Sequence, residues 1–206
     1  MAEAAGQEAE RATERQTAAP PSPQPGLWRE LREAYALHER RLMNPAFWAV
    51  ANYRFGVWSA RRGFTPWRKL TSLLYGWCFF WIDLITGIAI NREAEIGPAF
   101  HLIHHGNVKI HPEARIGARC GMMHDVTLGL SPGREGAPVI GNDVFIGAGA
   151  KIVGPVEIGD GAMIGANSLV INHVPAGATA LGVPARAMPG SRGAPKRQVS
   201  STKTQQ

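Results

Sequence analysis

Large aliphatic residues recur at every sixth position through the C-terminal half of the chain. Residues 139–174 divide into VIGNDV, FIGAGA, KIVGPV, EIGDGA, MIGANS and LVINHV. The second position of each unit is large and aliphatic, and the sixth is small or β-branched. A period of six matches neither an α-helix nor a simply alternating strand. The positions expected in the core are Ile140, Val144, Ile146, Ala150, Ile152, Val156, Ile158, Ala162, Ile164, Ser168, Val170 and Val174.

The same period appears upstream in two blocks that are offset by two residues. A six-residue unit fits a short strand followed by a corner, so that three units complete one coil. Successive coils then stack at ~4.8 Å, the spacing of adjacent strands. The sequence therefore predicts a parallel β-helix. The upstream core positions are Ile90, Ile96, Leu102, Ile110, Ile116, Met122 and Leu128.

The pattern before residue 89 is helical. Residues 27–42 carry apolar side chains at helical spacing, and Asn44-Pro45 ends that segment. Pro45 suits the first turn of a second helix over 46–62. A third helix starts near Thr65-Pro66 and includes residues 72–88.

The third helix is ambiguous because Leu73 to Ile88 is almost wholly apolar. Basic residues precede the run, and Asp83 interrupts it. A spanning helix needs ~20 apolar residues and rarely tolerates a central carboxylate, so we do not expect a transmembrane segment. Two interpretations stay open: a helix packed inside the protein or an oligomer, and a helix lying on a membrane through residues 70–88.

These patterns divide the chain into four parts. We expect a disordered tail over 1–26, a helical region over 27–88, a β-helix over 89–188 and a second tail over 189–206. The N-terminal tail has no apolar stretch of the kind found in a signal peptide, so the expected location is cytoplasmic, with the inner face of the membrane allowed by the third helix.

Charge and cysteine content narrow the function classes. The net charge is +6, but the basic residues are scattered, so we do not expect nucleic-acid binding. Attraction to an anionic cofactor or membrane fits equally well. Cys78 and Cys120 have neither zinc-ligand nor disulfide-framework spacing, and Cys120 falls at an inward position of the repeat. We expect both cysteines to serve packing.

The repeat is interrupted once, over residues 129–138. The insertion reads GLSPGREGAP and carries Arg134 and Glu135 as its only charged residues. A solenoid accommodates such an insertion as a loop at a corner. We interpret it as a loop that either covers a binding groove or is neutral.

Four of the seven histidines lie in HLIHHGNVKIH, residues 101–111. His104 stands two positions after the inward residue Leu102, and His124 stands two positions after the inward residue Met122. The register therefore predicts that these two rings are neighbours on an outer surface, with Asp125 close enough to orient one of them. His105 stands one position further on and is the second choice. We expect the remaining two, His101 and His111, to point elsewhere, and the scatter argues against a zinc site, which needs three or four convergent ligands.

Residues 85–188 resemble the hexapeptide-repeat acyltransferases of the serine acetyltransferase-like branch. The similarity rests on ITGIAINREAEIG, HHGNVKI, DVTLG, GAPVIGNDVFIGAGAKIVG, IGANSLV and GVPAR, and extends weakly to NPAFWAVANYRFGVW. The IHHG tetrapeptide is similar to colanic-acid-type exopolysaccharide acetyltransferases. The resemblance implies a left-handed β-helix, a homotrimer with the active site between neighbouring chains, and transfer of acetyl from acetyl-CoA to a hydroxyl.

Two departures from the branch concern the acceptor. Serine acetyltransferases carry an Asp-His pair where this chain has Ile103-His104. They carry an Arg-His pair in the loop where this chain has Gly136-Ala137. An arginine matches a carboxylate well, so its absence argues against free serine. We therefore expect a saccharide hydroxyl of exopolysaccharide biosynthesis as the acceptor, with serine as the alternative.

The implied chemistry assigns roles to individual residues. A neutral imidazole is suited to removing a hydroxyl proton near pH 7, and the resemblance gives that role to His104. A backbone N–H of a neighbouring coil would stabilise the oxyanion. The resemblance places acetyl-CoA at Ala148, Ala166 and Arg186, of which the last could meet a phosphate. The rival from another class is a non-catalytic trimeric β-helix scaffold.

Overall fold

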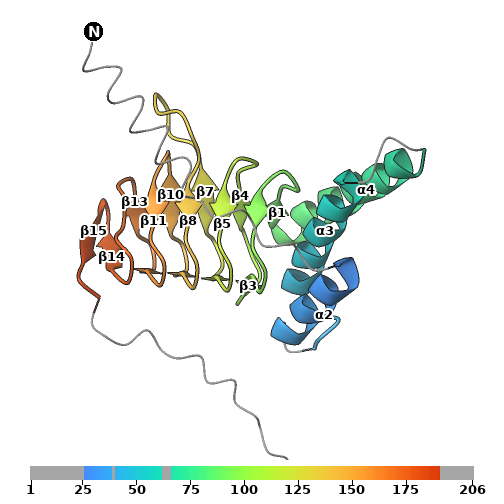
Figure 1. Ribbon diagram of the computed structural model, residues 1–206, viewed down its shortest axis with the longest axis horizontal. Coiled ribbons are helices and arrows are strands. Elements are labelled where there is room, and N and C mark those ends of the chain that lie inside the picture. Colours follow the sequence, from blue (N-terminus) through green and yellow to red (C-terminus); the bar gives the residue numbers. More distant parts are fainter. Residues whose placement is uncertain (1–25, 39, 62–65, 191–206) are drawn as a thin grey trace, which may run out of the picture.

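A computed structural model describes residues 26–38, 40–61 and 66–190. Within these residues, three helices precede a stack of β-coils (Figure 1). The helices are α2 (Leu27–Leu37), α3 (Pro45–Ala60) and α4 (Pro66–Thr86). The expected tails, 1–26 and 189–206, lie almost wholly outside the described residues.

The β-coils form a parallel β-helix with three sheets along its sides. Sheet 1 contains β1 (Ala89–Ile90), β4 (Lys109–Ile110), β7 (Thr127–Gly129), β10 (Lys151–Val153) and β13 (Leu169–Val170). Sheet 2 contains β2 (Glu95–Ile96), β5 (Arg115–Ile116), β8 (Val139–Ile140) and β11 (Glu157–Ile158). Sheet 3 contains β3 (His101–Leu102), β6 (Gly121–Met122), β9 (Phe145–Ile146), β12 (Met163–Ile164), β14 (Thr179–Gly182) and β15 (Ala185–Met188).

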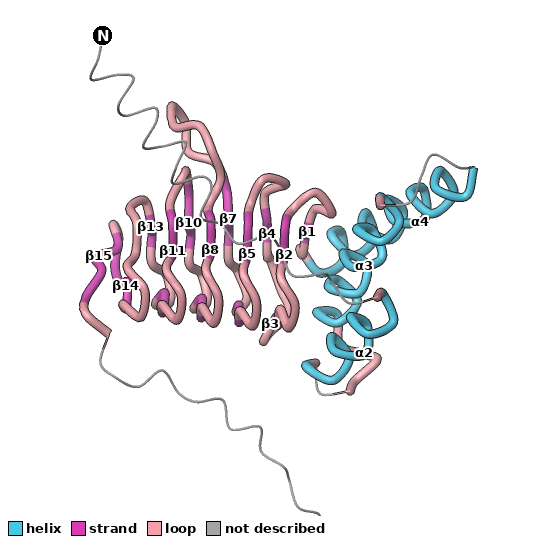
Figure 2. The backbone as a smooth tube through the Cα atoms, in the orientation of Figure 1, coloured by secondary structure: helices cyan, strands magenta, loops and turns pink. Residues whose placement is uncertain are grey.

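The register of the coils confirms the six-residue prediction. Ile116 pairs with Ile140 across sheet 2, and Ile152 pairs with Val170 across sheet 1. Every predicted core position is buried, and Ile146 and Ile152 have no exposed surface. The offset between the upstream blocks arises because the first coil has two extra residues between β3 and β4. The tube in Figure 2 shows how the short strands alternate with turns along the stack.

The helical region covers the first coil through a few specific contacts. Tyr53 on α3 donates a hydrogen bond to the Ala94 carbonyl at 2.8 Å and accepts one from the Ile96 N–H at 3.1 Å. Arg54 is 4% exposed and donates to the carbonyls of Ile96 and Gly97. Its guanidinium also lies 3.8 Å from the Glu30 carboxylate. These contacts satisfy backbone groups that the end of a solenoid would otherwise leave open.

Helix boundaries follow the expected signals. The Asn44 side chain accepts a hydrogen bond from the Ala46 N–H at 3.0 Å, and Pro45 occupies the first turn of α3. The first helix ends at Leu37, five residues earlier than the expected segment, and His38 closes its last turn.

The apolar helix α4 is not enclosed within the chain. Its buried residues are Thr71 and Tyr75, and the interpretation that the helix is packed inside the single chain is therefore wrong. Asp83 is paired with Lys109 on β4. Within the described residues, no helix combines the length and hydropathy required to cross a membrane. The exposed large side chains of α4 are Trp67, Leu70, Leu73, Leu74, Trp77, Phe80, Trp81, Leu84 and Ile85.

Candidate active site

One edge of the β-helix carries most of the predicted site residues. This edge, the 3–1 corner, consists of the segments that lead from sheet 3 to sheet 1: 103–108, 123–126, 147–150 and 165–168. The inward residues at the ends of β3, β6, β9 and β12 are in register. The residues two positions after each of them form a row: His104, His124, Ala148 and Ala166.

Backbone hydrogen bonds hold the corner together from coil to coil. The Asp125 N–H donates to the Gly106 carbonyl at 2.9 Å, and the Gly149 N–H donates to the His124 carbonyl at 3.0 Å. The next coil repeats the bond between the Asn167 N–H and the Ala148 carbonyl at 2.8 Å. The corner segments that carry His104, His124, Ala148 and Ala166 thus form one continuous ladder, a relation that the six-residue period alone did not predict.

His104 and His124 are neighbours, as the register predicted. Their ring centroids are 5.9 Å apart, and the rings are arranged edge to face. Both residues are exposed. Either ring can therefore reach a substrate lying over the corner.

Asp125 faces Lys151 in the structure. The Lys151 ammonium lies 3.1 Å from the Asp125 carboxylate and 2.6 Å from its carbonyl oxygen. Asp125, Gly149 and Asn167 occupy equivalent turn positions with φ of 58°, 74° and 55°. Asp, Gly and Asn tolerate this left-handed conformation best, so the turn alone explains an aspartate here.

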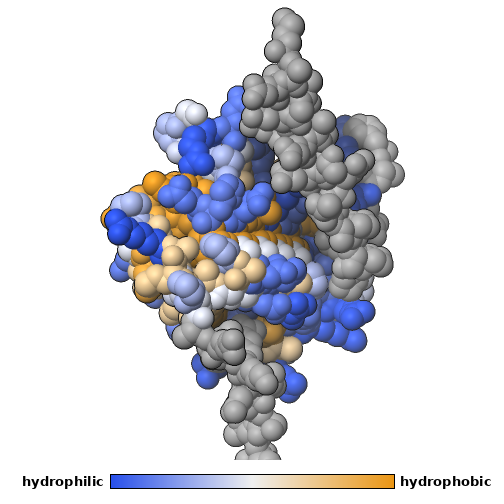
Figure 3. All heavy atoms as spheres, turned by 60° about the vertical axis from the view of Figure 1, so that its left-hand side comes forward, coloured by the Kyte–Doolittle hydropathy of each residue, from blue (hydrophilic) through white to orange (hydrophobic). Residues whose placement is uncertain are grey.

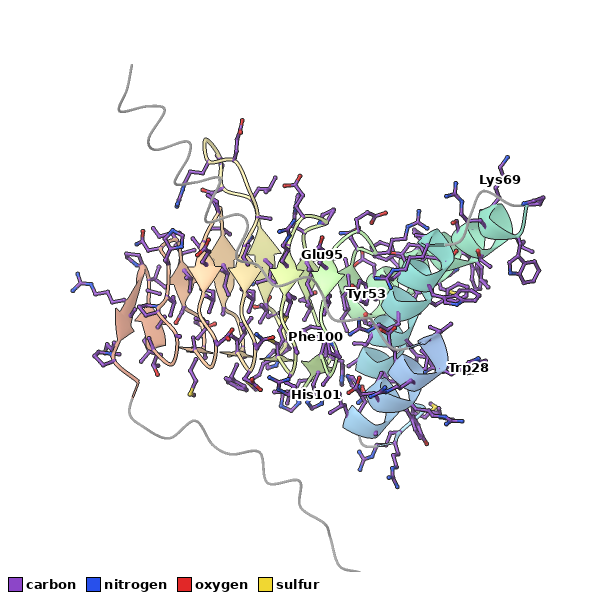
Figure 4. All side chains as sticks on the ribbon, viewed as in Figure 1. Trp28, Tyr53, Lys69, Glu95, Phe100 and His101 are labelled. Carbon is purple, nitrogen blue, oxygen red and sulfur yellow. The ribbon has the colours of Figure 1, made fainter. Side chains whose placement is uncertain are left out.

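A groove of about 520 Å³ lies beside His104, between the end of α2 and β3. The helical region supplies more than half of its lining residues, and the rest come from strand β3 and the turn after it. Figure 4 shows His101 at the edge of the β-helix that faces α2. The lining residues are His38, Arg41, Met43, Asn44, Pro45, His101, Ile103, His104 and His105.

The groove changes the assignment of one histidine, His101. His105 is exposed and lines the groove, so it stays the second choice. The prediction that His101 points elsewhere is wrong, because α2 folds over β3 and brings His101 into the same wall. His111 does lie apart, and its Nδ1 accepts a hydrogen bond from the Glu113 N–H at 3.2 Å.

His38 is one of the groove residues that sequence reasoning missed. It is 1% exposed, and its ring packs edge to face against His101 with a centroid distance of 5.0 Å. A histidine at the end of an amphipathic helix carries no repeat signal, and only the packing of α2 against β3 brings it to the groove.

Small residues make the remainder of the 3–1 corner flat. A Cβ atom added to Gly147 would lie 2.7 Å from the Ala166 nitrogen, so the coils approach too closely for a side chain there. Arg186 lies beyond the row on β15, where it pairs with Leu181 on β14 and is exposed. An extended ligand could run along this surface from the histidines toward Arg186.

The cysteines and the inserted loop lie outside the site. Cys120 is 1% exposed, its thiol donates to the Gly141 carbonyl at 3.1 Å, and burial raises the pKa of this thiol to about 11. Burial also raises the pKa of the Cys78 thiol. The loop 129–138 projects from the corner between sheets 1 and 2, where Arg134 donates to the Ile171 carbonyl at 2.8 Å. Within one chain the loop therefore lies at a different corner from the 3–1 corner that carries His104, and Figure 1 shows it projecting beside β7.

No group of three or more potential metal ligands occurs within residues 26–38, 40–61 and 66–190.

Residues 137–172 match the family model described as bacterial transferase hexapeptide (six repeats). The serine acetyltransferase of Mycobacterium tuberculosis is 36% identical over 141 residues, which cover 68% of this chain and 62% of that protein. Coverage of other curated relatives is lower, down to 37% of the probable serine acetyltransferase 4 of Oryza sativa subsp. japonica, so the chain spans less than two thirds of these proteins.

Solved structures show the same architecture. The soybean serine acetyltransferase apoenzyme superposes with a TM-score of 0.68 at 30% identity, covering 80% of this chain and 70% of that chain. Serine acetyltransferase from Brucella abortus strain S19, solved in complex with coenzyme A, gives a TM-score of 0.67 at 25% identity, covering 80% and 67%. The predicted left-handed β-helix with N-terminal helices is thereby confirmed, whereas these matches do not show the expected similarity to exopolysaccharide-type enzymes.

Proposed function

We propose that this chain, which belongs to the hexapeptide-repeat transferases, is an acetyltransferase that moves an acetyl group from acetyl-CoA to a hydroxyl. The observation that carries the proposal is the row of His104, His124, Ala148 and Ala166 along one corner. It sets two exposed imidazoles at one end of a flat, small-residue surface.

Acetyl-CoA fits the 3–1 corner by shape and by charge. The pantetheine arm would extend over Ala148 and Ala166, and Arg186 would meet a phosphate of the nucleotide end. The relative from Brucella abortus that was solved with coenzyme A has the same fold, which supports this placement.

His104 would act as the general base. Its imidazole takes the proton of the acceptor hydroxyl as that oxygen attacks the thioester carbonyl carbon. The C–S bond then breaks, and the resulting imidazolium returns the proton to the departing thiolate. No acyl-enzyme is required. His124 packs against the His104 ring and would help to fix its orientation, while Asp125 is held by Lys151.

L-Serine is the first candidate acceptor, because the matched relatives are serine acetyltransferases. A saccharide hydroxyl is the second candidate, and a specific observation favours it. The groove wall beside His104 carries the apolar Ile103, and the loop has Gly136-Ala137 where the branch has an Arg-His pair. These residues offer a serine carboxylate no ionic partner, although Arg41 stands elsewhere in the groove wall.

Release of the CoA thiol tests both the activity and the acceptor. The purified protein would be given acetyl-CoA with L-serine in one arm and methyl α-D-glucopyranoside in the other. Transfer to either acceptor, identified by the mass of the acetylated product, supports the proposal. A protein that binds acetyl-CoA but acetylates neither acceptor would favour the non-catalytic scaffold.

Side-by-side packing of three chains would complete the site. Because loop 129–138 lies at a different corner from His104, it can cover that residue only from a neighbouring chain. Hydrophobic areas reach the surface of the β-helix side in Figure 3, as a packed interface requires. A mass of three chains in sedimentation equilibrium supports this assembly, and a monomer contradicts it.

The exposed face of α4 would attach the protein to a membrane surface. It presents Trp77 and Trp81 among aliphatic side chains, and Arg68 and Lys69 stand near its start. Amphipathic helices with aromatic and basic residues bind anionic lipid surfaces. Co-sedimentation with phosphatidylserine-containing vesicles, lost in Trp77→Ser/Trp81→Ser, supports this role. Self-association that those substitutions abolish, without vesicle binding, would assign the face to a second copy instead.

A further inference from the structure

The end of α2 brings a buried imidazole with one unused nitrogen to the groove beside His104. His38 lines that groove and has 1% of its surface exposed. Its ring is held between His101, at a centroid distance of 5.0 Å, and Phe47, at 6.4 Å. The ring therefore has little freedom to turn.

The tautomer of His38 follows from its one hydrogen bond. The Nδ1 atom lies 2.6 Å from the Ala34 carbonyl oxygen. A carbonyl oxygen can only accept, so Nδ1 must carry the proton and donate it. Burial lowers the pKa of His38, which keeps the second proton off the ring near neutral pH. Nε2 is then a bare lone pair.

That lone pair has no hydrogen-bond partner among the described residues and is itself buried, so a ligand in the groove reaches it only when a neighbouring side chain moves aside. Leaving a buried acceptor unsatisfied costs about 1–3 kcal/mol. A phenylalanine would fill the same space without this cost, and a buried polar atom without a partner in a native structure calls for an explanation, such as a catalytic role or a bound water or ion. His38 stands in the wall of a groove that also contains the candidate base.

We propose that His38 Nε2 accepts a hydrogen bond from a second donor group of the acceptor substrate, next to the hydroxyl that His104 deprotonates. The inference rests on the proposed function and deepens it. The acceptor must then carry two donors: the reacting hydroxyl and either an ammonium, as in L-serine, or another hydroxyl, as in a saccharide. His38 would thus select the acceptor and orient it.

Two substitutions separate this role from a structural one. His38→Asn keeps a donor near the position of Nδ1, so the bond to Ala34 can persist, but it deletes Nε2. His38→Gln places an oxygen acceptor near the position of Nε2 and loses the bond to Ala34. We therefore expect His38→Asn to impair the reaction of the acceptor more than the stability of the protein, and His38→Gln to impair stability more than the reaction.

The test measures kcat/KM for L-serine and for methyl α-D-glucopyranoside, the KM for acetyl-CoA, and the melting temperature. We expect His38→Asn to lower kcat/KM for the active acceptor about tenfold, the effect of one lost hydrogen bond to a bound substrate. Its KM for acetyl-CoA and its melting temperature should stay close to those of the unsubstituted protein. His38→Gln should retain more acceptor activity than His38→Asn while melting at a lower temperature. A lower kcat/KM for L-serine identifies the second donor as the ammonium, and a lower kcat/KM for methyl α-D-glucopyranoside identifies it as a hydroxyl.

Several outcomes would overturn the inference. Unchanged acceptor kcat/KM in His38→Asn, or an equal loss for acetyl-CoA, rejects the role of His38 and leaves the proposed function intact. Transfer to neither acceptor by the unsubstituted protein rejects the proposed function. A tautomer measurement is independent of activity: ¹⁵N NMR should show the His38 proton on Nδ1 in the free protein, and a proton on Nε2 would contradict the proposal.

Discussion

In the β-helix, each sixth residue from Ile140 to Val170 is at most 2% exposed, whereas α4 leaves nine large apolar side chains in contact with solvent. In the β-helix one local rule is repeated, so the position of a residue in its unit fixes whether it points inward. The helical region has no such rule. Its position depends on individual contacts, above all those of Tyr53, Arg54 and His38. The same hydrophobic composition therefore has different structural meaning in the two regions.

Removing the buried arginine between the two regions should have the largest effect on stability. Arg54→Ala leaves the Glu30 carboxylate buried without its partner and two carbonyls of the first coil without donors. We expect a loss of about 3–5 kcal/mol in the free energy of unfolding, measured by urea denaturation. The matched control is Arg119→Ala, which removes an exposed pair with Asp143 and should cost at most about 1 kcal/mol. Equal losses would mean that Arg54 does not hold the regions together.

Truncating one aliphatic residue in each region compares them directly. Ile152→Ala should destabilise the protein by about 2–5 kcal/mol, because Ile152 is fully buried in the coil stack. Leu73→Ala on α4 should change stability by about 0.5 kcal/mol or less, because Leu73 is 72% exposed. A large loss in Leu73→Ala for the isolated protein would show that α4 is covered in solution, and its dependence on protein concentration would identify a second copy as the cover.

A bulky side chain at the 3–1 corner should weaken cofactor binding without unfolding the repeat. Ala166→Tyr would obstruct the flat surface and raise the KM for acetyl-CoA about tenfold or more, a cost of the order of one overpacked contact. Ala176→Tyr is the control, because Ala176 is also exposed but lies at the corner between sheets 2 and 3. If both substitutions raised the KM for acetyl-CoA equally, acetyl-CoA would not bind along the row at the 3–1 corner.

Acidification should produce the smallest effect, through His38. Burial lowers the pKa of His38 relative to the unfolded chain, so the unfolded state binds the proton more readily. The contribution of neutral His38 to the free energy of unfolding is therefore fully present above the unfolded pKa of about 6.5. This contribution is lost as the pH falls through the pKa of His38 in the folded protein. The only titratable ring found facing His38 in the described structure is that of His101. Urea denaturation at about pH 7.5 and about pH 5.5 should show a smaller drop for His38→Asn than for the unsubstituted protein, and an identical drop would contradict this assignment.

The sequence could predict the β-helix and part of the site for the same reason. A period of six predicts which residues are inward, and this register alone brings His104 and His124 together although they are twenty positions apart. It could not predict the groove, because the path of α2 over β3 depends on non-periodic contacts. The expectation for His101 and the packing of α4 inside a single chain were wrong for this reason, and His38 was not considered.

The exchange of His104 for alanine tests the central claim most directly. If His104 is the general base, acetyl transfer by His104→Ala should fall by about 10²–10⁴-fold while the KM for acetyl-CoA stays the same. His111→Ala is the matched control and should transfer acetyl at the unsubstituted rate, because His111 lies outside the groove. Transfer at the unsubstituted rate by His104→Ala would contradict the account.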